Sequence, residues 1–253
     1  MISAVAENVR AEHDGHILRI TLARPEVRNA LSAATLADIT AAFSDVGDAR
    51  VVLLAGEGAS FCAGADVEEL KGATARTGDD VRHEAAALVG MLVAVNDCPV
   101  PVVCRVQGHA FGGGAGLVGA SDIVVAHEDA QFGFSEVKLG IAPSSILPFV
   151  VPKIGIGNAR RYLLSGERFD GREAKRIGLV HEAAADLDGA TAKILDEFRS
   201  TAPRATRESK RLLRERVFEL SPDEVIARAA LTDEGQEGVR SFLERRKPDW
   251  DLT

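Results

Sequence analysis

Three consecutive glycines, Gly112, Gly113 and Gly114, constrain this chain most, because only a short apolar stretch separates them from the next predicted strand at Asp122. Glycine lets the backbone turn sharply and lets a ligand approach its N–H groups closely. A short helix that begins at these glycines would point the positive end of its dipole at that ligand. The pattern predicts a site for developing negative charge, such as an oxyanion. Close helix–strand packing without chemistry is the alternative interpretation.

Three glycines of this run, Gly114, Gly116 and Gly119, match the G-x-G-x-x-G spacing that is typical of dinucleotide-binding folds. That fingerprint needs a full helix, a return strand and an acidic residue about 20 positions further on. A helix that must end before Asp122 is shorter than the dozen or more residues of a βαβ crossover. The spacing therefore argues against a nucleotide site.

A second stretch of small residues, 58–67, follows a predicted buried strand. Asp66 is expected to cap a short helix that starts at Val67, so this stretch also ends at a helix N-terminus. Two such loops could converge on one carbonyl oxygen. Cys62 in this stretch is either a nucleophile or a buried thiol. The buried thiol is the preferred interpretation, because no particular histidine can be paired with it from the sequence.

Length, charge and cysteine content exclude several classes of function. The 253 residues, 46% of them hydrophobic, suffice for one large domain or a domain with a small appendage. A formal net charge of −8 argues against a nucleic-acid partner. Cys62, Cys98 and Cys104 show no metal-ligand spacing, which predicts no metal site and reduced thiols in a cytoplasmic protein. No secretory signal is apparent, and no apolar run reaches the roughly 20 residues of a membrane helix.

Periodicity divides the chain into an α/β core over 1–190 and a helical C-terminal region over 191–253. Strands are predicted at 16–22, 51–54, 99–106, 122–126 and 131–134. Helices are predicted after Ser32, after Gly114 and at 67–70, 81–96, 158–164, 171–177, 187–199, 204–218, 222–230 and 234–245. Residues 71–80 are expected to form a polar surface segment. The helical region is too short for a domain of its own, so it should pack on its own core or on a neighbouring subunit.

Five motifs, in order along nearly the whole chain, resemble those of the crotonase superfamily, the enoyl-CoA hydratase/isomerase family. They are Arg-Pro-Glu-Val-Arg-Asn-Ala-Leu at 24–31, Phe-Cys-Ala-Gly-Ala-Asp at 61–66, Gly-Gly-Gly-Ala-Gly-Leu at 112–117, Phe-Gly-Phe-Ser-Glu-Val-Lys-Leu-Gly-Ile-Ala-Pro at 132–143 and Glu-Gly-Val-Arg-Ser-Phe-Leu-Glu-Arg-Arg-Lys-Pro at 237–248. The resemblance implies a crotonase-like ββα spiral core with a helical C-terminal trimerisation region. It also implies an acyl-CoA enzyme that forms a homotrimer or a dimer of trimers. Coenzyme A is then part of the substrate, and no cofactor or membrane partner is expected.

The resemblance also implies the site residues. The N–H groups of Ala65 and Gly113 would hold the thioester oxygen, and Glu136 would be the catalytic carboxylate. Substrate contacts are implied for Glu26, Val27, Arg28, Ala63, Gly64, Asp66, Val67, Gly112, Gly116, Phe242 and Lys247. From the residues alone, Glu136 could equally be a surface or capping carboxylate near a turn.

Position 116 departs from the pattern of the two-carboxylate hydratases of this family, which carry a glutamate there and share a water between the two acids. This chain has Gly116 and keeps only Glu136. A single positioned acid–base group is worth about 10²–10⁴ in rate, so Glu136 could still support hydration or isomerisation. Gly116-Leu117 together with 135–140 resembles a branch that includes methylglutaconyl-CoA and isohexenylglutaconyl-CoA hydratases. Loss of a carboxylate would ease binding of a carboxylated acyl chain and make room for a branch.

Three hypotheses follow from these residues. The first is an enoyl-CoA hydratase, a lyase that adds water across the α,β double bond of an acyl-CoA with a branched or carboxylated, methylglutaconyl-like acyl group. The second is an enoyl-CoA isomerase or decarboxylase that uses a single glutamate. The third is a non-catalytic CoA-binding homologue.

Overall fold

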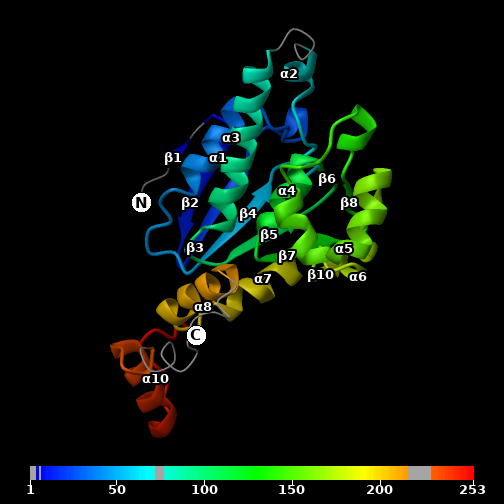
Figure 1. Cartoon of the computed structure of the whole chain (residues 1–253). Coiled ribbons are helices and arrows are strands. Elements are labelled where there is room, and N and C mark those ends of the chain that lie inside the picture. Colours follow the sequence, from blue (N-terminus) through cyan, green and yellow to red (C-terminus); the bar gives the residue numbers. More distant parts are fainter. Residues whose placement is uncertain (1–3, 6, 72–76, 216–228) are drawn as a thin grey trace.

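The computed structural model describes residues 4–5, 7–71, 77–215 and 229–253 (Figure 1). The strands are Ala4–Val5 (β1), Val9–Asp14 (β2), Ile17–Leu22 (β3), Val51–Gly56 (β4), Val102–Val106 (β5), His109–Phe111 (β6), Ile123–His127 (β7), Gln131–Gly133 (β8), Phe169–Asp170 (β9) and Glu182–Ala184 (β10). The helices are Ala33–Ala42 (α1), Val67–Lys71 (α2), Gly78–Asn96 (α3), Gly113–Ala120 (α4), Leu147–Ser165 (α5), Gly171–Arg176 (α6), Leu187–Glu197 (α7), Pro203–Glu215 (α8) and Asp233–Glu244 (α10), with 3₁₀ helices at Pro25–Val27 (η1) and Glu136–Leu139 (η3).

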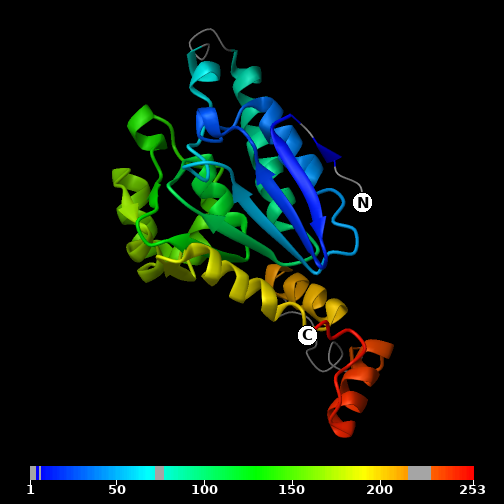
Figure 2. The ribbon, with the colours of Figure 1, turned by 180° about the vertical axis from the view of Figure 1, so that it is seen from behind.

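A twisted sheet in the order β1-β2-β3-β4-β5-β7-β10 forms the body of the molecule (Figures 1 and 2). Strands β1, β2 and β3 are antiparallel neighbours, whereas β3, β4, β5, β7 and β10 run parallel. A second, small sheet has the order β6-β8-β9. The parallel strands place their carboxyl ends at one edge, where open α/β sheets bind ligands.

Alternating side chains on the central strands build a hydrophobic core on each face of the sheet. Val52 and Leu54 of β4 belong to the large cluster that α1, α3, α4 and α5 complete. Val51 and Leu53, one position earlier in each case, belong to a smaller cluster with α7. Because side chains of a strand point alternately to its two faces, a sequence of consecutive apolar residues is what a strand buried on both faces requires.

Of the C-terminal helices, α7 and α8 lie against the sheet, whereas α10 projects from the body of the molecule. In Figures 1 and 2, α7 and α8 run across the end of the sheet, and α10 projects away from it at the end opposite α2. Lys210 of α8 anchors this region, because its buried Nζ donates to Val100 O at 3.0 Å and to Asp122 Oδ2 at 2.6 Å. The predicted boundary between residues 190 and 191 falls inside α7, whose apolar side packs on the sheet.

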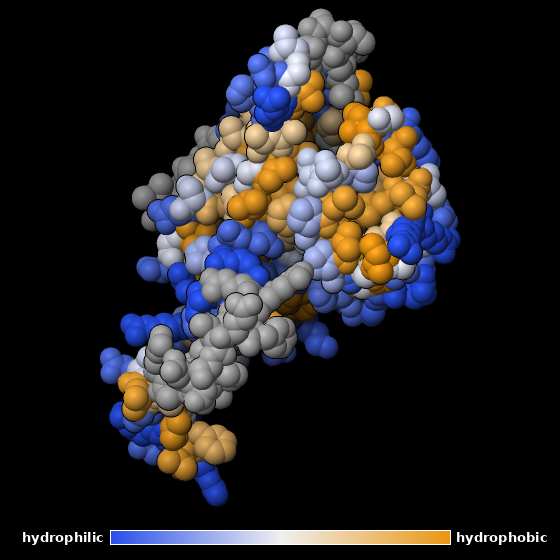
Figure 3. Space-filling view, viewed as in Figure 1, coloured by the Kyte–Doolittle hydropathy of each residue, from blue (hydrophilic) through white to orange (hydrophobic). Residues whose placement is uncertain are grey.

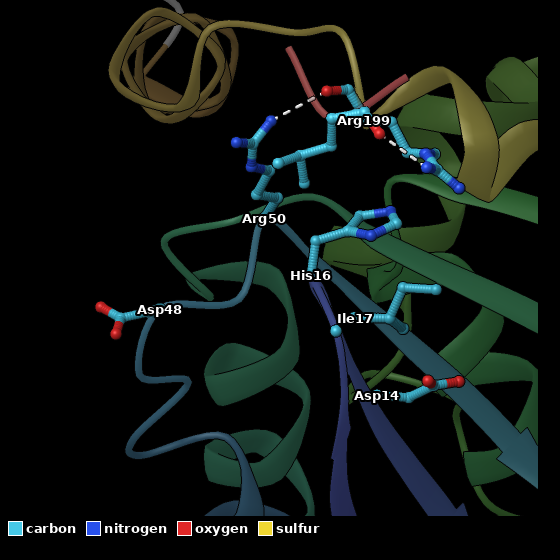
Figure 4. A pocket seen from close by; sticks show the side chains of 8 residues that line it. Asp14, His16, Ile17, Asp48, Arg50 and Arg199 are labelled. Carbon is cyan, nitrogen blue, oxygen red and sulfur yellow. Dashed lines mark hydrogen bonds between the residues drawn. The ribbon is translucent and has the colours of Figure 1, made fainter. Parts of the chain in front are cut away.

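A cavity of about 600 Å³ opens where the turn between β2 and β3 meets the C-terminal segment (Figure 4). Arg50 Nη1 donates to Arg199 O at 3.0 Å, and Arg199 Nη2 donates to Leu252 O at 2.6 Å. Both guanidinium groups are thus engaged with main-chain carbonyls. These bonds join the C-terminal segment to the amino-terminal end of β4.

The predicted elements agree with the structure in kind, and several boundaries are corrected. Helix α3 begins at Gly78 rather than at 81, because Thr77 and Asp80 form a capping box in a stretch that is polar enough to resemble a loop. Helix α5 begins at Leu147 rather than at 158, since prolines and a kink at Gly155 interrupt its pattern. The predicted strand at 99–106 begins at Val102, after its prolines. Most of the helix predicted at 222–230, and the end of the one predicted at 204–218, lie outside the described residues.

Candidate active site

Two loops leave the carboxyl ends of the adjacent parallel strands β4 and β5 and run side by side. Cys62 N donates to His109 O at 2.9 Å, and Phe111 N donates to Cys62 O at 3.1 Å. These bonds extend the pairing of β4 and β5 beyond the sheet. The loop 57–66 and the segment 107–113 therefore meet at the edge where a ligand of such a sheet is expected.

Glycines allow the two loops to touch through their backbones. A Cβ atom at Gly64, whose φ is +91°, would lie 2.8 Å from Phe111 O. A Cβ atom at Gly114 would lie 2.6 Å from Cys62 O and 2.8 Å from Cys62 Cβ. Close packing, the alternative interpretation of the glycine cluster, is thus observed, and it is also what brings the two loops together.

The amides of Ala65 and Gly113 are both available to a ligand. Leu31 N donates to Gly64 O at 2.8 Å and Asp66 N donates to Leu31 O at 3.2 Å, so the Ala65 N–H between them points away from Leu31. Gly113 is the first residue of α4, where N–H groups have no acceptor within the helix. Within the described part of the chain, neither amide donates a hydrogen bond to another residue. Ala65 is exposed and Gly113 is half-buried, so solvent or a ligand can reach them.

Glu136 is carried to the same place by the small sheet. Strands β6 and β8 pair in parallel with Phe111 opposite Gly133, and Gly112 N donates to Gly133 O at 3.0 Å. Glu136 begins η3 three residues after that pair. Its Oε1 lies 3.5 Å from the position that a Cβ atom of Gly112 would take. The carboxylate therefore faces the turn that exposes the Gly113 amide.

The carboxylate of Glu136 is only partly accessible and incompletely hydrogen-bonded. Its Oε2 is buried and has no hydrogen-bond partner among the described residues. Burial raises the pKa of Glu136 above its ordinary value, and a backbone hydrogen bond offsets this only in part. A surface or capping carboxylate would have solvent or an N–H group at both oxygens. A half-buried acid with a raised pKa and a free oxygen is instead typical of a proton-transfer group.

We expect Glu136→Gln to raise the melting temperature at neutral pH. Because burial raises the pKa of Glu136, the native state binds a proton more tightly than the unfolded chain does, and stability falls as pH rises through that raised pKa. Gln is neutral at every pH and avoids this loss. Melting temperatures of both proteins are measured by calorimetry from acid to neutral pH. They should agree below the ordinary pKa of 4.5, diverge as the pH rises from there to the raised pKa, and stay apart above it. A native protein that is more stable than the variant at neutral pH would contradict the expectation.

Asp66 is confirmed as a helix cap, because its Oδ1 accepts from Glu68 N at 3.0 Å. It is buried, and its Oδ2 accepts from Arg24 Nη1 at 3.0 Å. The sequence had indicated no role for Arg24, although a buried carboxylate generally needs a cation. Both carboxylate oxygens of Asp66 thus hold the loop in place.

The other predicted substrate contacts fall into two groups. Ala63 N donates to Arg28 O at 3.0 Å, so η1 and the residue after it lie beside the 61–66 loop. Glu26, Val27 and Arg28 are exposed there, as is Val67 at the start of α2. Phe242 and Lys247 instead belong to the projecting C-terminal segment, at the opposite end of the molecule from α2 (Figures 1 and 2). Within one chain, the structure does not bring these two residues together with Glu136.

The surroundings of Gly116 contradict the expectation that this position leaves room for a branched acyl group. A Cβ atom at this position would lie 2.7 Å from Ile146 Cγ2 and 3.3 Å from both Leu92 methyl carbons. The sequence suggested that the missing side chain leaves room for a branched acyl group, but these aliphatic side chains fill the space. A contact between residues thirty positions apart gives no signal in a single sequence.

Cys62, the alternative nucleophile, is fully buried, and burial raises its pKa to about 12. A thiol in this state is unreactive at neutral pH, which confirms the buried-thiol interpretation. Over the described ranges, no group of three or more His, Cys, Asp and Glu side chains could hold a metal ion. No helix in these ranges is long and apolar enough to span a membrane.

Fold and site together define an α/β protein with one half-buried acid beside a glycine turn and two amides that have no acceptor among the described residues. The model of the enoyl-CoA hydratase/isomerase family matches residues 12–252. The chain is 38% identical to Pseudomonas aeruginosa AtuE, whose structure superposes with a TM-score of 0.91 over 97% of this chain and 100% of the other. An enoyl-CoA hydratase from Shewanella pealeana gives a TM-score of 0.91 at 31% identity, with 96% of each chain covered. The mevalonyl-coenzyme A hydratase of Aspergillus fumigatus is 34% identical over 93% of this chain and 91% of its own.

The chain belongs to the enoyl-CoA hydratase/isomerase family and has the crotonase fold. The fold class and the family predicted from the five motifs are thereby confirmed.

Proposed function

We propose that this enzyme is an enoyl-CoA hydratase that adds water across the α,β double bond of an acyl-CoA thioester, with Glu136 as its acid–base group. The observation that carries the proposal is the buried, unpartnered Oε2 of Glu136 beside Gly112. An acid held in this way is ready to bind water or to exchange a proton with a substrate. The free amides of Ala65 and Gly113 supply the donors that an acyl thioester needs.

The reaction then proceeds in two proton transfers. The thioester oxygen accepts hydrogen bonds from Ala65 N and Gly113 N, which stabilise the enolate as its charge develops. The Glu136 carboxylate removes a proton from water while the oxygen of that water bonds to the β-carbon. The resulting carboxylic acid gives the proton to the α-carbon, which restores the carboxylate and yields the β-hydroxyacyl thioester.

We further propose that the acyl group is branched at its β-carbon. A carboxylated acyl group, as in methylglutaconyl-CoA, is the alternative. The alternative has one argument in its favour, since with Gly116 no second carboxylate from that position would repel an anionic chain. The name of the mevalonyl-coenzyme A hydratase of Aspergillus fumigatus supports a branched substrate, because a mevalonyl group carries a methyl branch at its β-carbon.

The second candidate function is isomerisation or decarboxylation of an acyl-CoA by Glu136 alone. It is favoured by the same lack of a second acid–base side chain, because moving a proton between the α- and γ-carbons requires only one carboxylate. The third candidate is a CoA-binding homologue without activity. It requires that the free amides bind a thioester without turnover.

A panel of enoyl-CoA thioesters separates these functions. We expect loss of the enoyl absorbance and formation of a β-hydroxyacyl-CoA, identified by mass spectrometry from a gain of one water. Products of unchanged mass would instead indicate isomerisation, and a loss of carbon dioxide would indicate decarboxylation. Thermal stabilisation by CoA without turnover on any thioester would indicate the CoA-binding homologue.

We propose that the chain assembles as a homotrimer or a dimer of trimers through its C-terminal region. Val239, Phe242 and Leu243 recur at helical spacing on α10 and are more than half exposed. Figure 3 shows apolar side chains on this projecting helix and on the side of the body that carries α5. Because α10 points away from its own site, Phe242 and Lys247 could border a CoA site only in a neighbouring copy, where Lys247 would provide a charge for phosphate.

Light scattering at micromolar concentration is expected to give the mass of three or six chains. Phe242→Glu should lower that mass, since it places a charge in the apolar face, whereas Glu244→Gln on the same helix should leave it unchanged. A monomeric native protein would contradict the proposed assembly.

We also place the enzyme in the cytoplasm. The supporting observation is that Cys62, Cys98 and Cys104 are all free and buried. Free thiols of this kind are usual in a reducing compartment.

A further inference from the structure

The face of α4 that carries Gly113 and Gly116 is the wall behind the proposed oxyanion donors. Gly116 N donates to Gly112 O at 2.9 Å, so Gly116 lies one turn beyond the glycine that Glu136 contacts. Side chains on a helix lean toward its N-terminus. A side chain at position 116 would therefore extend over the turn formed by Gly112 and Gly113, beside the carboxylate of Glu136.

Aliphatic side chains pack closely against this face of α4. Ile146 Cγ2 lies 2.7 Å, and the Leu92 methyl groups lie 3.3 Å, from the position that a Cβ atom at Gly116 would take. A Cβ atom at Gly113 would likewise lie 2.8 Å from a Leu31 methyl group and 3.3 Å from a Leu88 methyl group. Ile146 and Leu92 are fully buried, so this packing is continuous with the main hydrophobic core.

Ile146 is held in place by the same segment that carries Glu136. Its N–H donates to Pro143 O at 3.2 Å, and its carbonyl accepts from Val150 N at 3.0 Å, at the start of α5. Helix η3, which begins with Glu136, lies only a few residues earlier. The acid–base group and Ile146 thus belong to one stretch of chain and lie ten residues apart.

We infer that Ile146 is a specificity-determining residue, which closes the site at Gly116 to a second carboxylate and to any charged part of the acyl group. The inference rests on the proposed hydratase function. It assigns uncharged, aliphatic acyl groups to the site, including those with an alkyl branch at the β-carbon. An alkyl branch can lie against aliphatic side chains, whereas a carboxylate there would lose its water without gaining a partner.

The substrate preference of the native enzyme gives the first test. We expect kcat/KM for β-methylcrotonyl-CoA to exceed that for β-methylglutaconyl-CoA by at least about tenfold, the smallest discrimination that one group in an apolar pocket typically gives. Equal values, or a preference for the carboxylated substrate, would overturn the inference.

Shortening the Ile146 side chain gives the second test. Gly116→Glu alone should lower the melting temperature, because its Cβ collides with Ile146. In the double variant with Ile146→Ala, the melting temperature should return to that of Ile146→Ala. Hydration of crotonyl-CoA, a straight-chain substrate, should rise at least about tenfold over Ile146→Ala, since a second carboxylate can now hold the water. Ile154→Ala, a change of the same type further along α5, is the control and should not rescue Gly116→Glu.

These outcomes separate the inference from the proposed function. A double variant that remains as unstable as Gly116→Glu, or that is stable but hydrates crotonyl-CoA no faster, would overturn the role of Ile146 while native hydration stands. If the native enzyme hydrates none of the three thioesters but the double variant hydrates crotonyl-CoA, the proposed function fails and the role of Ile146 is supported.

Discussion

Glu136→Gln is expected to lower kcat by about 10²–10⁴-fold, the contribution of a positioned acid–base group. Gln keeps the size of the side chain but cannot accept the proton of the attacking water. The change leaves the amides of Ala65 and Gly113 in place, so the variant should bind CoA normally. Because it removes a half-buried carboxylate, the variant should also be at least as stable as the native enzyme. Steady-state kinetics on the best enoyl-CoA of the panel, together with calorimetry, measure both effects.

Glu182→Gln is the matched control for this change. Glu182 lies on β10 and pairs with Lys175 at 3.0 Å, in a partly exposed ion pair that contributes at most about 1 kcal/mol. The kcat of Glu182→Gln should equal that of the native enzyme. Undiminished turnover by Glu136→Gln would show that another group transfers the proton, and the role of Glu136 would then be rejected.

Gly114→Ala is expected to lower kcat by about 10²–10³-fold, the usual effect of losing one oxyanion donor. The added methyl group would lie 2.6 Å from Cys62 O, so it must push the 57–66 loop away from α4. The amides of Ala65 and Gly113 would then no longer lie at the separation that they have in the native enzyme. Overpacking of this kind also costs about 1–3 kcal/mol of stability, which calorimetry can detect.

Gly157→Ala separates this effect from a general response to alanine. Gly157 lies in α5, and a Cβ atom there would meet nothing within 4 Å. Replacing a helical glycine by alanine gains about 0.5–1 kcal/mol, so this control should be fully active and slightly more stable. A Gly114→Ala variant with native kcat would show that the contact of the two loops does not position the proposed oxyanion donors.

The parts of the fold that the sequence predicted are those governed by local patterns. Val51 to Leu54 are apolar on consecutive positions, which a strand buried on both faces requires, and they form β4. Ser32 and Asp66 precede helices that their side chains cap. Strands β1, β6, β9 and β10 were not predicted, because segments of two or three residues are too short to show a period. The six-residue strand β2 was also missed, because only Val9 and Ala11 of it are buried.

The parts of the site that could not be predicted depend on contacts between distant segments. The motif resemblance indicated Glu136, Ala65 and Gly113, and the structure adds that one carboxylate oxygen is buried and both amides are free. The sequence could not indicate that Ile146 fills the space at Gly116, because no local pattern links the two positions. The ion pair of Arg24 with Asp66 was missed for the same reason.

The central claim is that one thioester oxygen lies between the amides of Ala65 and Gly113 with Glu136 facing the adjacent carbons. A crystal structure with acetoacetyl-CoA, an unreactive thioester of similar size, tests it most directly. We expect the thioester oxygen to lie about 2.7–3.1 Å from both nitrogens, with a Glu136 oxygen next to the α- or β-carbon. A thioester bound elsewhere, or the two amides directed to different ligand atoms, would contradict it.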